Sequence, residues 1–251
     1  MNPALPPSAS LSDAKSRLRD STRPPSRHRL PTAPLTDCSW TNRVFAERRK
    51  SHASQPARLL GSHELRGPAT PVKTLPDLLR KGMKLVIVGC NPSESAVRVG
   101  HYYSGRGNEF WPLLFAGRVI PEPFDYHDDK RLIEFGIGLT DLVKKPTKAP
   151  GELTRQDFAE GRILLSQKLE EFSPHVVAFN GKQTYEQFAQ RKGKLGLHKE
   201  LLYGARVYVL PLTGGAEGKG KAEKLKHFRK LAQLIAKTQK RNETQTSVIL
   251  S

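Results

Sequence analysis

Apolar runs alternate with amphipathic stretches from about residue 74 onward, and this alternation predicts the secondary structure. Three runs are apolar on both faces, as buried strands are, and a fourth is interrupted by Gly138: Lys84–Val88, Pro174–Asn180, Arg206–Pro211 and Ile137–Val143. Helices are expected at residues 75–81, 108–117, 128–135, 154–172, 181–191 and 219–238. Strands that alternate with helices predict a three-layer α/β/α sandwich with a mainly parallel central sheet.

Local signals support several of these boundaries. Thr154 is followed three residues later by the acid Asp157, a pattern close to a capping box, in which each side chain bonds the backbone of the other residue. Pro112 falls in the first turn of its helix, where it is tolerated, and Gly82 would end the helix at 75–81. The last predicted helix carries an apolar face made of Leu225, Phe228, Leu231, Leu234 and Ile235.

Residues 1–72 show neither the apolar period of a strand nor that of a helix, and they are expected to form a disordered tail. Pro, Ser, Arg and Thr dominate there, so the segment buries too little apolar area to offset the entropy of ordering it. An organelle transit peptide is an alternative, but Asp13 and Asp20 interrupt the segment and no clear amphipathic helix is present, which favours a DNA-binding arm. We therefore expect a basic tail at 1–72, one folded domain at 73–240 and a flexible C-terminal end at 241–251.

The chain is strongly basic, which narrows the choice of partner. Its formal net charge is +18, from 42 Lys and Arg against 24 Asp and Glu, with the excess at both ends. A merely soluble surface does not require such one-sided charge, so DNA or RNA is favoured. The two cysteines, Cys38 and Cys90, lie far apart, which fits a reduced intracellular protein without a metal site. No apolar run approaches the ~20 residues that a membrane helix needs.

The connection after the first predicted strand, residues 89–111, is unusually long, because such connections typically take about 2–6 residues. It begins with Asn91-Pro92, which is also a common way to start a turn. It then places paired Tyr residues between glycines, and rings on a flexible backbone suit stacking on a planar ligand. A core position for Tyr103 is the alternative. The segment is therefore a candidate binding loop.

Two further unusual segments also follow predicted strands. Asp141 lies in an apolar stretch, where a carboxylate must be paired, hydrogen-bonded or functional; a cap at the strand end is the alternative. The Gly-rich turn at 211–220 could hold a phosphate, and the Lys-rich helix after it suits either a nucleic-acid backbone or solvent. Because ligands of parallel sheets bind at the carboxyl ends of the strands, we expect segments 89–111, 138–146 and 211–220 to converge.

Together these motifs resemble the mismatch-specific uracil-DNA and thymine-DNA glycosylase family. The resemblance runs from about Leu85 to Leu234 and rests on Gly89–Pro92, Gly100–Trp111, Gly138–Val143, Pro146–Thr147 and Gly181–Gln187. It implies a uracil-DNA glycosylase-like fold. It also implies hydrolysis of the N-glycosidic bond of uracil, or of a mispaired or damaged base, after the base is flipped out of duplex DNA. It implies no metal and no cofactor.

The resemblance further implies roles for single residues. Asn91 matches the Asn that orients the attacking water, and Tyr103 matches the aromatic residue that stacks on the flipped base. The 211–217 turn matches the motif that grips flanking phosphates and fills the vacated stack. Cys90 and Asn108 are expected to bind the base beside Tyr103. The residues expected to contact DNA are Ser93, Thr213, Gly214, Gly215, Ala216, Lys219 and Lys221.

Three positions depart from the pattern of the family. Ser93 stands where the family usually has Gly, Asp141 where familiar members have Asn or Lys, and Ala216 where relatives have a bulky wedge. We expect Asp141 to handle the water together with Asn91, since a carboxylate can accept a proton and stabilise positive charge on the sugar. The small Ala216 predicts weaker product retention and weaker reading of the opposite base.

The principal hypothesis is a monomeric DNA glycosylase of base excision repair that acts on DNA containing uracil or mismatched bases. Mispaired thymine and deaminated purines are further candidate substrates, and no membrane partner is expected. It would work on the nucleoid in the cytoplasm of a bacterium, or in another DNA-containing compartment. Two alternatives stay open. One is a non-catalytic nucleic-acid binder on the same fold. The other is a hydrolase of free nucleosides or nucleotides, which would not need the basic ends.

Overall fold

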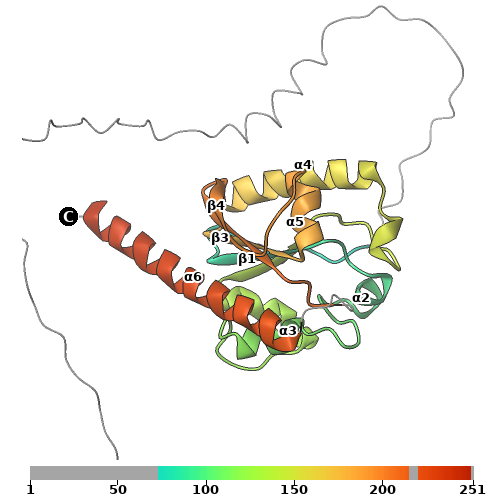
Figure 1. The fold of residues 1–251 in the computed structure, drawn as a ribbon, viewed down its shortest axis with the longest axis horizontal. Coiled ribbons are helices and arrows are strands. Elements are labelled where there is room, and N and C mark those ends of the chain that lie inside the picture. The colour runs from blue at the N-terminus through green and yellow to red at the C-terminus, as the bar shows by residue number, and fades with distance from the viewer. Residues whose placement is uncertain (1–72, 215–219, 250–251) are drawn as a thin grey trace, which may run out of the picture. The chain divides into compact units, whose positions relative to one another are not determined.

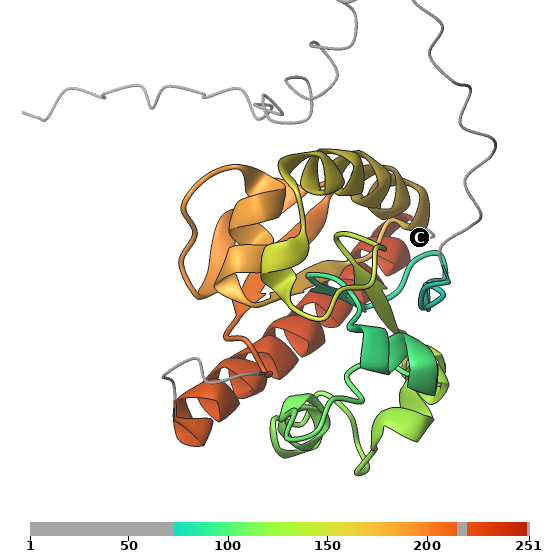
Figure 2. The same cartoon turned by 90° about the vertical axis from the view of Figure 1, so that its right-hand side faces the viewer.

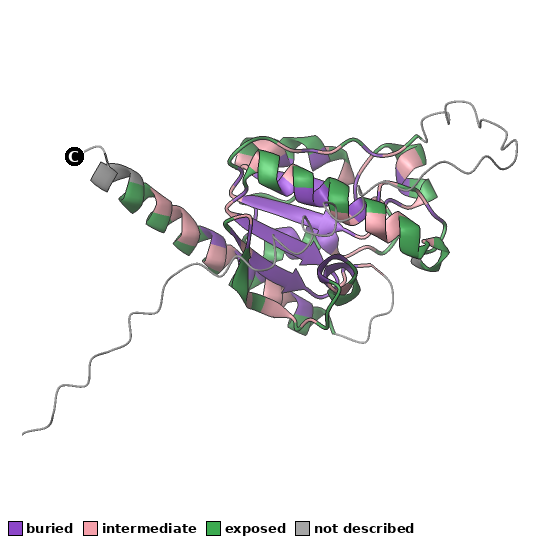
Figure 3. Ribbon diagram, turned by 90° about the horizontal axis from the view of Figure 1, so that it is seen from above, coloured by how far each residue is buried: buried purple, intermediate pink, exposed green. Residues whose placement is uncertain are grey.

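A five-stranded sheet forms the middle layer of the structure (Figure 1), a computed structural model that describes residues 73–214 and 220–249. Its strands are β1 (Leu85–Gly89), β2 (Ile137–Asp141), β3 (Val176–Asn180), β4 (Gly196–Leu202) and β5 (Ala205–Leu210). They lie in the order β2-β1-β3-β5-β4, and all neighbours are parallel except β4 and β5. The apolar runs β1, β2 and β3 are buried along their whole length, as Figure 3 illustrates.

Helices cover both faces of this sheet. On one face lie α4 (Arg155–Phe172) and α5 (Lys182–Ala189), and on the other lie α3 (Phe110–Ala116) and α6 (Lys221–Ile249), as Figures 1 and 2 show from two sides. The shorter elements are α2 (Glu94–Val99) and two 3₁₀ helices, η1 (Tyr126–Phe135) and η2 (Pro150–Glu152). The three-layer α/β/α architecture with a mainly parallel sheet is thus confirmed.

The residues before β1 do not form the expected helix at 75–81. Leu78 instead makes an antiparallel bridge with Leu139, in which each backbone N–H donates to the carbonyl of the other residue at 2.9 and 3.0 Å. Since β2 is an edge strand, its outer backbone groups need partners, and this segment supplies them. Gly138 does not interrupt β2: a Cβ there would lie 2.7 Å from Leu78 O, so the glycine admits the covering segment.

Other differences from expectation have local causes. The long loop contains α2, whose N-cap Ser93 accepts a hydrogen bond from the Ala96 N–H at 3.1 Å. The edge strand β4 was missed because His198, Lys199 and Glu200 interrupt its leucines, so it shows no continuous apolar run. Helix α6 continues past its expected end at Thr238 because no Gly or Pro interrupts residues 221–249. The capping box at Thr154 and Asp157 is confirmed at the start of α4.

The order of the strands determines where a ligand can bind. From β1 the chain continues to β2 on one side of the sheet, whereas from β3 it continues toward β4 and β5 on the other side. Connections that diverge in this way open a crevice at the carboxyl ends of the two strands. Among the described residues, no helix is both long and apolar enough to cross a membrane.

Candidate active site

A glycine at the end of β1 brings two chemically important side chains together. Gly89 pairs in register with Asp141, the last residue of β2. A Cβ on Gly89 would overlap Oδ1 of Asp141 and would lie 3.3 Å from the hydroxyl of Tyr103. Only glycine therefore leaves room for the carboxylate and the phenol above the end of β1. This meeting point lies at the carboxyl ends of β1 and β2, next to β3, where the strand order predicts ligand binding.

The Asp141 carboxylate is almost fully buried, with 4% of the residue exposed. Its Oδ2 lies 3.7 Å from Lys144 Nζ and has no hydrogen-bond partner in the described part of the chain. Burial raises the pKa of Asp141 to about 6; the positive charge of Lys144 opposes this rise, and the negative charge of Asp77 adds to it. Asp141 is thus mostly ionised at neutral pH but close to the pH at which it gains a proton.

A partly buried ionic network lies next to Asp141. Lys144 Nζ donates to Asp77 Oδ1 at 3.0 Å and to the hydroxyl of Tyr102 at 3.1 Å. Asp77 also accepts from Thr140 Oγ1 at 2.7 Å and pairs with Lys168 Nζ at 2.5 Å. Burial favours a raised pKa for Asp77, but these cations and hydrogen bonds outweigh it and lower that pKa. Lys144 therefore stands between two carboxylates and is held more closely by Asp77 than by Asp141.

Tyr103 has the geometry of a stacking platform. Its ring packs on Phe110 with centroids 3.7 Å apart and planes 18° from parallel. Its backbone lies in the left-handed region at φ 55°, which is strained for an aromatic residue and is often found at functional sites. The ring is half-buried, whereas the hydroxyl is buried and has no hydrogen-bond partner among the described residues. Burial, and next the charge of Asp141, raises the pKa of Tyr103, so the phenol stays a neutral donor.

Asn180, the last residue of β3, is a site residue that sequence reasoning missed. It is 3% exposed, its Nδ2 donates to Thr213 Oγ1 at 3.0 Å, and its Oδ1 is buried without a partner in the described residues. Its side chain is close enough to Tyr103 to affect the pKa of the phenol. The available signal was a polar residue that ends an otherwise apolar strand and precedes a glycine.

Three buried polar atoms thus gather around the ends of β1, β2 and β3: Asp141 Oδ2, Tyr103 Oη and Asn180 Oδ1. Buried polar groups are nearly always hydrogen-bonded, so a group of them without protein partners is what a polar ligand would complete. The Tyr103 hydroxyl can donate a hydrogen bond, and Asp141 Oδ2 and Asn180 Oδ1 can each accept one. That combination suits the edge of a nucleobase, which presents both donors and acceptors.

Asn91 lies on the side of the loop that faces the residues after β2. Its Nδ2 donates to Thr147 Oγ1 at 2.7 Å, to Lys145 O at 3.1 Å and to Pro92 O at 3.2 Å. Because two of these partners are carbonyl oxygens, which only accept, the amide nitrogen must face them and Oδ1 must point away. Asn91 and Asp141 follow adjacent strands, but no hydrogen bond joins their side chains in the described residues.

The other predicted site residues are placed as follows. Cys90 lies beside Asp141, and burial followed by that charge raises its pKa to about 11, so the thiol stays protonated. Asn108 uses Oδ1 to accept from the Phe110 N–H at 3.0 Å, while its Nδ2 faces Gly214. The Ser93 hydroxyl caps α2, and the Thr213 side chain is buried against Asn180. Lys221 is exposed at the start of α6, and Gly215, Ala216 and Lys219 lie outside the described residues.

The 211–214 segment does reach the binding loop. The Glu109 N–H donates to Thr213 O at 3.0 Å, and Glu109 also pairs with the buried Lys224 of α6 at 2.6 Å. In the described residues, no group of three His, Cys, Asp or Glu side chains is arranged to hold a metal ion.

Comparisons with known proteins identify a family and a similar solved structure. Residues 76–237, more than half of the chain, match the family described as the Uracil DNA glycosylase superfamily. The fold is similar to a solution NMR structure of a uracil-DNA glycosylase candidate from Methanosarcina acetivorans. That similarity has a TM-score of 0.43 and 20% sequence identity, and it covers 65% of this chain and 98% of the other.

Proposed function

The chain belongs to the uracil-DNA glycosylase superfamily, and from this premise we propose that it removes uracil from DNA as a glycosylase of the mismatch-specific type. The substrate would be a uracil, or another mispaired or deaminated base, that is flipped out of the duplex. Flipping costs a few kcal/mol and costs least for a mispaired base, which itself favours lesions.

The observation that carries the proposal is the group of Asp141, Tyr103 and Asn180 at the carboxyl ends of the strands. The Tyr103 ring, fixed against Phe110, would stack on the extruded base. The Tyr103 hydroxyl and the Asn180 carbonyl would satisfy its polar edge. The backbone of the loop that carries both Asn91 and Tyr103 would then place water and base in one pocket.

The reaction breaks the bond between the base nitrogen and C1′ of the sugar, and its electron pair leaves with the base. A water oxygen bonds to C1′ and gives up a proton. Asn91 would orient this water through Oδ1, the side of its amide that points away from Lys145 and Thr147. Asp141 would stabilise the positive charge that develops on the sugar and accept the proton. A carboxylate with a pKa near 6 suits this role at neutral pH.

Oligonucleotides that carry U, T, hypoxanthine or xanthine opposite each base, followed by alkaline cleavage of abasic sites, test the proposal. We expect cleavage at uracil in the wild-type protein and in Glu171→Gln, a control that changes an exposed acid to its amide. Binding to every duplex without abasic product would instead identify a non-catalytic nucleic-acid binder. Release of uracil only from free deoxyuridine would identify a nucleoside hydrolase.

A further inference from the structure

The exposed face of α6 is continuously basic. No Asp or Glu occurs between Lys224 and Asn242. The exposed cations of this stretch, which we call the basic face, are Lys226, Arg229, Lys230, Lys237, Lys240 and Arg241. Their spacing keeps them on the side opposite the buried Phe228, Leu231 and Ile235, over about 22 Å of helix. Figure 1 shows the end of α6 reaching beyond the sheet, so part of this face lies clear of the other elements.

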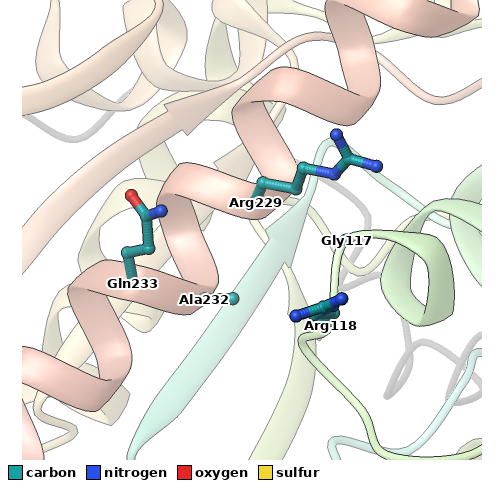
Figure 4. A pocket seen from close by; sticks show the side chains of 5 residues that line it. All are labelled: Gly117, Arg118, Arg229, Ala232 and Gln233. Atoms are coloured by element: carbon teal, nitrogen blue, oxygen red, sulfur yellow. The ribbon is translucent and has the colours of Figure 1, made fainter.

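The basic face borders a groove between α6 and the loop after α3 (Figure 4). The groove has a volume of about 430 Å³ and is lined by Gly117, Arg118, Arg229, Ala232 and Gln233. A Cβ on Gly117 would lie 2.5 Å from Phe228 Cβ, so the glycine lets the two elements approach closely. Arg118 and Arg229 line the same groove from different elements. Neither forms an ion pair with a carboxylate of the described residues.

The backbone at Arg118 is unusual. It closes the C-terminus of α3 in the left-handed region at φ 60°, with its N–H donating to Phe115 O at 2.8 Å. Glycine is the residue that ordinarily occupies such a position because it adopts this conformation without strain. The backbone conformation therefore does not explain why an arginine occupies this position, and we look for the explanation in its side chain.

We propose that the basic face of α6 and the Arg118–Arg229 groove form a second contact site for the phosphate backbone of DNA, separate from the base pocket. Two arginines that line one groove without carboxylate partners supply the positive charge and the N–H donors that phosphates bind. A membrane surface fits less well, because the apolar face of α6 packs against the domain and, among the residues whose exposure is described, no large exposed apolar residue lies on this helix.

The position and length of α6 indicate how much additional duplex this site could contact. The helix begins just after the turn that reaches the binding loop and has 29 residues, or about 43 Å, which corresponds to about 13 base pairs of duplex. The contacts would extend the footprint away from the flipped base. The proposal rests on the proposed function only for the identity of the polyanion as DNA, and it does not depend on catalysis.

Binding of the full chain to undamaged duplexes, measured over a range of salt concentrations, tests this site. In Arg118→Gln/Arg229→Gln we expect the slope of log K against log salt to fall by about 1.8, since each phosphate contact adds about 0.9. The corresponding loss of affinity is up to about 60-fold at about 0.1 M salt. The effect should be larger for a duplex of about 30 base pairs than for one of about 10.

The matched control is Lys81→Gln/Lys199→Gln, which removes two exposed cations that form no ion pair in the described residues. We expect it to keep the wild-type salt slope. An unchanged slope in the arginine variant, or an equal fall in the control, contradicts the proposal. Weaker binding of the arginine variant to anionic phospholipid vesicles, with unchanged DNA binding, would make a membrane the partner instead.

Arg118→Gly separates a binding role from a structural one. Glycine relieves the left-handed backbone, so we expect the thermal stability to be equal or higher while DNA binding weakens. Wild-type DNA binding by this variant would overturn the role of Arg118. Because the duplexes are undamaged, these results stay distinguishable from a failure of the proposed glycosylase activity.

Discussion

Lys144 should control the pH at which the protein becomes active, and two substitutions should shift that pH in opposite directions. The proposed mechanism requires an ionised Asp141, whose pKa is raised by burial to about 6. Lys144 Nζ lies 3.7 Å from Asp141 Oδ2 but is held at 3.0 Å by Asp77. In Lys144→Met, Asp141 loses its nearest cation and should ionise only at higher pH. In Asp77→Asn, Lys144 is released toward Asp141 and a nearby negative charge disappears, so Asp141 should ionise at lower pH.

The distance sets the size of the effect. Two unit charges about 4 Å apart interact by about 4 kcal/mol at the effective dielectric constant of protein sites, which corresponds to about three pH units as an upper bound. Solvent and the remaining charge of Lys168 reduce this value. We therefore expect the midpoint of the acid side of the pH–rate profile to rise by about one to three pH units in Lys144→Met.

The assay is the single-turnover rate of uracil release from a G·U duplex between about pH 5 and about pH 9. Each profile is normalised to its own plateau, so partial loss of folded protein does not move the midpoint. Lys144→Arg keeps the cation and should stay near the wild-type midpoint. The reasoning is refuted if Lys144→Met and Asp77→Asn shift the midpoint in the same direction or leave it unchanged.

Three further predictions concern the same pocket. Because the folded-state pKa of Asp141 is raised from 3.8 to about 6, its ionisation destabilises the fold as pH rises through this window, by about 3 kcal/mol above it. Asp141→Asn should therefore raise the free energy of unfolding near pH 7.5 but not below about pH 4. Urea denaturation at both pH values measures this, and equal effects at the two would contradict it. Gly89→Ala should cost about 1–3 kcal/mol and most of the activity, because the new methyl group overlaps the Asp141 carboxylate; a fully active variant would disprove the close approach. Thr147→Val removes the hydroxyl that accepts a hydrogen bond from Asn91 Nδ2, so it should lower the rate of bond cleavage while DNA affinity is kept. A loss of affinity alone would argue that Thr147 does not position Asn91 for catalysis.

Periodicity was enough to predict the fold, because the central strands are apolar on both faces and amphipathic helices alternate with them. The same approach failed for residues 75–81 and for β4. Both lie at sheet edges. The first takes part of its hydrogen bonding from β2, and the second is mostly exposed and has polar residues between its leucines. Neither feature leaves a periodic apolar pattern in the sequence.

The candidate site was predictable where an unusual residue stood in an apolar setting, as at Asp141, or in an unusually long loop, as at Tyr103. Asp77 and Lys144 were not recognised, because charged residues are common in loops and their meeting depends on the packing of segments far apart in sequence. The left-handed backbone of Tyr103, and the space that Gly89 leaves for the Asp141 carboxylate, likewise cannot be recognised without the structure.

The central claim is that Asn91 and Asp141 cleave the bond between uracil and deoxyribose in DNA. The most direct test measures abasic product from a G·U duplex at saturating enzyme, for the wild type, Asn91→Ala and Asp141→Asn, with DNA binding measured in parallel. The account predicts product from the wild type and none from either variant, although both still bind the duplex. Release of uracil at the wild-type rate by both variants would contradict it.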